Sequence, residues 1–124
     1  MEQVENFFKR KIKLAKINET THAVIFPMYK LDTEMQYEIN LISDKGRFYL
    51  SDQGFTYKEL DEIFEMNEPD VKKNIIGILK HFGCFKEKGS NAFFIECTPQ
   101  DIDIKLSYLI QAMSLMQNMK IFYE

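Results

Sequence analysis

The sequence predicts a single α+β domain over residues 1–124, with helices around an antiparallel sheet. Three observations indicate this class. Segments in which apolar and polar residues alternate, as in half-buried strands, are bounded by turn-forming residues. Segments with apolar residues three and four positions apart, as in amphipathic helices, stand before, between and after them. The length of 124 residues and the apolar content of 45% are ordinary for one globular domain.

The first element is predicted to be an amphipathic helix over residues 2–16, because its apolar residues recur at helical spacing. Its opposite face is basic and would be a contact site for an anion or a nucleic acid. The candidate residues are Lys9, Arg10, Lys13 and Lys16. The alternative is an ordinary solvated face, since any amphipathic helix carries charged residues opposite its apolar stripe.

Three strands are expected next, over residues 22–29, 35–41 and 47–50, and the simplest arrangement is an antiparallel meander. Pro27 lacks a backbone donor, which favours an edge or a bulge for the first of them. A later hairpin is predicted from residues 84–88 and 92–97, which flank Gly-Ser-Asn.

Two middle helices are expected after the meander. Asp52 and Gly54 predict a structural turn, and Thr56 with Glu59 fits a capping box for a helix over 57–66. That helix should bury Leu60, Ile63 and Phe64. The second helix is expected over residues 69–82, with proline in its first turn and Gly83 as its stop.

The last helix is predicted over residues 99–120 and carries two apolar stripes. One contains Ile102, Leu106, Leu109, Met113 and Met116, and the other contains Ile104, Tyr108, Ala112, Leu115 and Met119. A helix that is apolar over most of its circumference must be covered on more than one side, by the first helix or by a second subunit. The pattern therefore predicts a homodimer and a partner-binding surface. Its candidate residues are Met113, Met116, Met119, Phe122 and Tyr123, with core packing as the alternative for the methionines.

Known catalytic and cofactor-binding motifs are not found, and no cofactor is expected. His81 and Cys84 have a spacing that zinc ligands use, but Cys97 and His22 stand far from them, so small, reduced, buried thiols are the preferred interpretation. Basic and aromatic residues interleave around the Asp52 turn, which would suit stacking on single-stranded bases. They are Arg47, Phe48, Tyr49, Phe55, Tyr57 and Lys58.

The cellular location is expected to be the cytoplasm. The chain opens with acidic residues where a secretory signal needs positive charge, and no apolar run reaches the roughly 20 residues that span a bilayer. A membrane partner is not expected.

The order of these motifs resembles the bacterial and phage family called domain of unknown function 1828. The resemblance rests on Ser51-Asp52-Gln53-Gly54 with Thr56 and Leu60, then Asn74, Ile78-Leu79, Phe82-Gly83, Ile95-Glu96, Thr98 and Leu109-Ile110-Gln111-Ala112-Met113. It spans residues from about 20 to 120. The family usually carries an acidic residue where Gln53 stands, which weakens the idea of an acidic metal pair here. The resemblance implies an α+β domain carried by phages and mobile elements, without an established chemistry.

The leading hypothesis is a non-enzymatic protein that docks on a host protein, for example in defence or replication. The alternative is a nucleic-acid-binding regulator that uses the basic N-terminal residues. A metal-dependent enzyme is the third hypothesis, with Glu38, Asp44 and Asp52 as the carboxylates to test.

Overall fold

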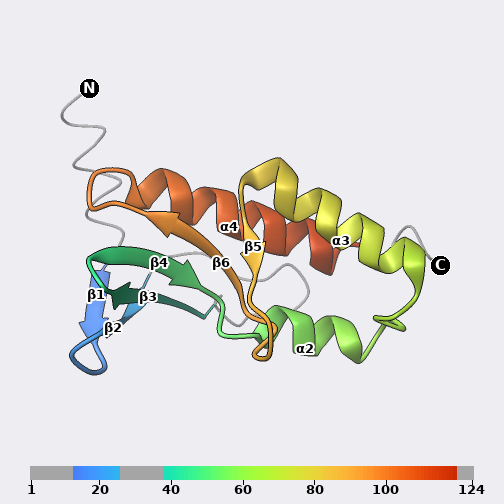
Figure 1. Cartoon of the computed structure of the whole chain (residues 1–124), viewed down its shortest axis with the longest axis horizontal. Coiled ribbons are helices and arrows are strands. Elements are labelled where there is room, and N and C mark those ends of the chain that lie inside the picture. Colours follow the sequence, from blue (N-terminus) through green and yellow to red (C-terminus); the bar gives the residue numbers. More distant parts are fainter. Residues whose placement is uncertain (1–12, 26–37, 120–124) are drawn as a thin grey trace.

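A computed structural model of the chain describes residues 13–25 and 38–119 and shows an α+β fold (Figure 1). In these ranges the elements are β1 (Lys13–Lys16), β2 (Thr21–Ile25), β3 (Ile39–Asp44), β4 (Arg47–Ser51), α2 (Phe55–Asp61), α3 (Pro69–Phe82), β5 (Phe85–Lys86), β6 (Phe93–Cys97) and α4 (Ile102–Gln117). The α+β class and the long last helix are confirmed.

The strands form one antiparallel sheet in the order β1-β2-β3-β4-β6-β5. The predicted meander and the predicted hairpin both occur, and the pairing of β6 with β4 joins them. The register places Leu50 opposite Leu41 on one side and opposite Ile95 on the other. These side chains share the face of the sheet on which α4 packs, called here the helix face. The opposite face is called the outer face.

The predicted N-terminal helix is wrong over residues 13–16, which form the edge strand β1. Backbone pairing with β2, with Lys13 opposite Ile25 and Lys16 opposite His22, replaces helical hydrogen bonds there. Lys13 and Lys16 are three positions apart, so a strand directs them to opposite faces of the sheet. The remainder of that helix, with Lys9 and Arg10, lies outside the described residues. Because β1 pairs beside it, β2 is an interior strand, and Pro27 also lies outside the described ranges.

The turn between β3 and β4 is shorter than the gap of residues 42–46 between the two predicted strands. Strand β3 continues through Asp44, and only Lys45 and Gly46 form the turn, with φ of 51° and 80°. Two central residues with positive φ are typical of a type I′ hairpin, whose twist matches that of the flanking strands.

Helix α2 begins directly after Gly54 and ends at Asp61, so the expected span of 57–66 is wrong. The capping box is also wrong, because Thr56 is buried inside the first turn of the helix rather than at its cap. Leu60 is buried as expected, whereas Ile63 lies beyond the helix end and is 54% exposed. The early end removes Ile63 from the apolar face that the spacing suggested.

Helix α3 spans the predicted residues 69–82. The Glu68 carboxylate accepts a hydrogen bond from the backbone N–H of Val71 (3.1 Å), and Gly83 ends the helix with φ of 71°. Helix α4 begins three residues later than expected. The reason is a closed turn in which the Thr98 N–H donates to Asp101 Oδ1 (2.6 Å) and the Asp101 N–H donates to Thr98 Oγ1 (3.3 Å).

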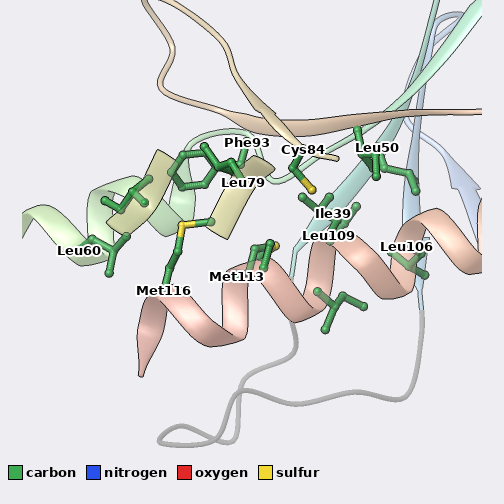
Figure 2. Packing of buried hydrophobic residues seen from close by; sticks show 14 of the residues in the cluster. Ile39, Leu50, Leu60, Leu79, Cys84, Phe93, Leu106, Leu109, Met113 and Met116 are labelled. Atoms are coloured by element: carbon green, nitrogen blue, oxygen red, sulfur yellow. The ribbon is translucent and has the colours of Figure 1, made fainter. Parts of the chain in front are cut away.

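The core lies between the helix face of the sheet and helices α3 and α4 (Figure 2). Leu109 and Met116 of α4, Leu50 of β4 and Phe93 of β6 are fully buried in it. Helix α2 packs against α4 at one end of the sheet and contributes Leu60. None of the helices in the described ranges has the length and apolar character needed to span a membrane.

Candidate functional site

Helix α4 divides its apolar residues between the core and the surface. The inner stripe of Leu106, Leu109, Met113 and Met116 is buried. On the other side, Ile104, Tyr108 and Leu115 are 55%, 40% and 48% exposed. At about 100° per residue these three lie within about 40° of one another on the helix. They are called here the α4 outer stripe.

The methionines do not belong to this surface. Met113, Met116 and Met119 are all at most 3% exposed, and Met113 and Met116 point into the core (Figure 2). Their proposed role in partner binding is therefore wrong, and the core alternative applies. Phe122 and Tyr123 lie outside the described residues. The exposed apolar side chains that a partner-binding surface on α4 requires are instead those of Ile104, Tyr108 and Leu115.

The outer face of the sheet also carries apolar side chains. The strand register places Ile42 opposite Tyr49 and Phe94 opposite Phe85 on this face. The Tyr49 and Phe94 rings meet edge to face at 5.8 Å, and the Phe94 and Phe85 rings lie 5.8 Å apart with a 30° tilt. A sheet covered on one side usually presents polar residues on the other. The rings of Tyr49, Phe94 and Phe85, called here the aromatic row, depart from that pattern.

A pocket of about 270 Å³ lies beside the aromatic row. It is lined by Ile42, Asp44, Tyr49, Ser51, Glu87 and Phe94. The charged residues in the described part of its lining are both acidic, Asp44 at the end of β3 and Glu87 directly after β5. The Glu87 carboxylate is held by the Ser90 hydroxyl, which donates to Oε1 at 3.1 Å. The pocket therefore combines two ring walls with two carboxylates.

Arg47 is the basic residue of β4 that shares the outer face. Its Nε lies 3.8 Å from Glu96 Oε1. A hydrogen bond with the Tyr49 side chain and the nearby Glu96 carboxylate raise the pKa of Arg47 above its ordinary value. Arg47 is thus engaged beside the pocket by partners on its own sheet, and it is not among the pocket's lining residues.

Asp52 holds the turn between β4 and α2. Its carboxylate is fully buried and accepts hydrogen bonds from the backbone N–H groups of Gly54 (2.9 Å), Thr56 (3.3 Å) and Phe93 (2.8 Å). These donors satisfy the carboxylate without any ligand. The role of Asp52 and Gly54 in this structure is a structural turn.

The carboxylates of the enzyme hypothesis do not converge. Ser51 pairs with Asn40, which places Asp52 and Glu38 at one end of β3, while Asp44 lies at the other. Six strand residues separate those ends by about 20 Å. Over residues 13–25 and 38–119, no three His, Cys, Asp or Glu side chains gather in a way that could hold a metal ion.

The two cysteines are buried, free thiols on the helix side of the molecule. Burial raises the pKa of each thiol to about 11. Because the thiolate is the reactive form, both thiols remain protonated and unreactive near neutral pH. This environment is that of small core residues rather than of an activated nucleophile.

The interleaved basic and aromatic residues are brought together only in part. Phe55, Tyr57 and Lys58 line one pocket of about 370 Å³ beside the Asp52 turn. Arg47 lies beside Tyr49 on the outer face of the sheet. Phe48 packs on the core and Tyr49 points to the outer face, as neighbours in a strand must. Tyr57 lies on α2, with the Lys86 ammonium 5.2 Å from its ring centre. The basic groups Lys13 and Lys16 stand at the far edge of the sheet. A continuous stacking platform is not formed by these residues.

Sequence reasoning missed the aromatic row on the outer face. The sequence did indicate its members, because the alternation within each strand places Tyr49 and Phe94 on the face away from the core. What the sequence could not show is that β4 and β6 are neighbours, which brings the rings into contact. Comparison with protein-family models, with curated proteins and with solved structures finds no match for this chain.

Proposed function

We propose that this chain is a non-enzymatic binding protein that docks on a host protein through the α4 outer stripe. The supporting observation is the exposure of Ile104, Tyr108 and Leu115 along one face of a helix whose opposite face is in the core. An amphipathic helix usually presents polar residues to water. Exposed apolar residues at helical spacing are the anchors with which helices bind apolar grooves of other proteins.

The chemistry of the remaining candidates favours binding over catalysis. The thiols of Cys84 and Cys97 are protonated near neutral pH, and the Asp52 carboxylate is satisfied by backbone donors. The resemblance to a phage and mobile-element family supports a partner in the host cell. A nucleic-acid partner is less supported, because the carboxylates of the outer-face pocket would repel phosphate.

The test is affinity capture from host lysate with matched variants. Ile104→Ser/Leu115→Ser removes two stripe residues, and the control Ile63→Ser/Ile76→Ser makes the same change at residues that are 54% and 51% exposed elsewhere. We expect one protein to be retained by the wild type and by the control, to be lost from the stripe variant, and to survive nuclease treatment. Capture that is equal for both variants, or that nuclease abolishes, overturns the proposal.

Light scattering separates a host partner from a second copy of the chain. The homodimer predicted from the two stripes of α4 would use the same surface. If the stripe binds a host protein instead, the purified protein has a mass near 14.7 kDa. A wild-type mass of twice that value, together with the mass of a single copy for the stripe variant alone, would assign the stripe to a homodimer. That result would overturn docking on a host protein.

A further inference from the structure

The outer-face pocket has the composition of a site for one positively charged side chain. Its walls are the Tyr49 and Phe94 rings, and its charged groups are the Asp44 and Glu87 carboxylates. Aromatic faces attract cations through their quadrupole, and carboxylates accept charge-assisted hydrogen bonds. Among the described residues that line the pocket, none is basic. Arg47 lies opposite Asp44 on the same face, and its guanidinium is engaged by Tyr49 and Glu96.

The size of the pocket limits its occupant. Its volume of about 270 Å³ lies below the roughly 300–1,000 Å³ of pockets that enclose drug-sized ligands. A single side chain is a better match than a whole cofactor or a nucleotide. An anionic occupant is disfavoured, because Asp44 and Glu87 would repel it.

The geometry of the pocket favours a guanidinium group over an ammonium group. A guanidinium is planar, so it can stack on the Phe94 or Tyr49 ring while its edge donates to a carboxylate. Both rings are held in place, since Tyr49 meets Phe94 edge to face and Phe85 supports Phe94 from β5. The Ser90 hydroxyl donates to Glu87 Oε1 and holds this carboxylate, so Oε2 is the oxygen that would accept from the guanidinium.

We propose that this pocket binds an arginine side chain of a protein partner. The site is separate from the α4 outer stripe, because the sheet lies between them. It therefore does not depend on the docking role of α4, and the two can fail independently.

The probe is N-acetyl-arginine amide, titrated into the full chain labelled with ¹⁵N and followed by NMR. The neutral, nearly isosteric N-acetyl-citrulline amide is the control ligand. We expect arginine amide to shift the backbone signals of Asp44, Tyr49 and Phe94 and to bind about tenfold more tightly than citrulline amide, which corresponds to one charge-assisted contact. Equal affinity for the two ligands, or shifts that cluster elsewhere, overturns the proposal.

Variants show whether the pocket or the general acidity of the chain attracts the probe. Asp44→Asn/Glu87→Gln keeps the shape of the pocket and removes its charge, and Asp61→Asn/Glu65→Gln removes the same charge from exposed positions elsewhere. Affinity should fall about tenfold in the first variant and stay within about twofold in the second. Equal losses in both variants overturn the proposal. Binding of oligothymidine at the same signals would assign the face to single-stranded nucleic acid and also overturn it.

Discussion

Asp52 and Phe93 exchange two hydrogen bonds across 41 residues of chain: the Phe93 N–H donates to Asp52 Oδ1 at 2.8 Å, and the Asp52 N–H donates to the Phe93 carbonyl at 3.1 Å. The pair joins the end of β4 to the start of β6. It therefore connects the meander to the C-terminal hairpin and positions the outer-face pocket, which both strands line.

Replacing Asp52 should destabilise the fold strongly. Asp52→Ala leaves the N–H groups of Gly54, Thr56 and Phe93 without their acceptor, and buried unpaired donors cost enough that we expect a loss of about 3 kcal/mol. Urea denaturation measures it. The control, Asp61→Asn at an exposed site, should change the free energy of unfolding by less than about 0.5 kcal/mol. A similarly small loss in Asp52→Ala would contradict the role assigned to this residue.

Gly54 should tolerate no side chain. Its φ is +90°, and a Cβ there would lie 2.7 Å from the Ser90 carbonyl oxygen. Gly46 has a similar φ of +80° but open space around it, so Gly46→Ala measures the backbone strain alone. We expect Gly54→Ala to be less stable than Gly46→Ala by about 1–3 kcal/mol, because the backbone at Ser90 must move to make room. Equal thermal unfolding shifts for the two variants would show that the close approach to Ser90 is unimportant.

The thiols should be protected from alkylation near neutral pH. Both have a pKa of about 11 in the folded chain, above the ordinary 9.0. A thiol pKa that is higher in the folded chain than in the unfolded chain stabilises the fold. This contribution is complete at pH values below the unfolded pKa, and it is lost as the pH rises from about 9 to about 11. Iodoacetamide at pH 7.5 should therefore label Cys84 and Cys97 much more slowly in buffer than in urea. Rapid labelling of either residue in the folded chain would refute its assigned environment.

The two stripes of α4 should differ sharply in their effect on stability. Leu109 is fully buried, so Leu109→Ala should cost about 3 kcal/mol through lost contacts and a cavity. Leu115→Ala on the outer stripe should change stability by less than about 0.5 kcal/mol. Chemical denaturation of both variants tests the difference. A large loss in Leu115→Ala would mean that the chain itself needs the outer stripe for folding.

The sequence predicted elements best where a local signal and the tertiary structure agree. Helix α3 has a proline start, a continuous apolar face and a glycine stop, and its predicted bounds at residues 69 and 82 are confirmed. Residues 13–16 have a helical pattern locally, but strand pairing with β2 decides their conformation. No short segment of the sequence indicates that pairing by itself.

The site was predicted only in part, for a similar reason. Two apolar stripes on α4 were visible from their spacing, but spacing does not say which stripe the sheet covers. The structure buries Met113 and Met116 and leaves Ile104 and Leu115 at the surface. Likewise, the pocket requires β4 and β6 to be neighbours, and that pairing brings together residues such as Tyr49 and Phe94 from distant parts of the chain.

Site-specific photocrosslinking in host cells tests the docking role of the α4 outer stripe most directly. Benzoylphenylalanine replaces Tyr108, which is 40% exposed on the stripe, or Phe55, which is 43% exposed on α2. We predict a covalent adduct with one host protein from position 108 and none with that protein from position 55. Adducts that are the same from both positions, or a position-108 adduct only between two copies of this chain, would contradict the account.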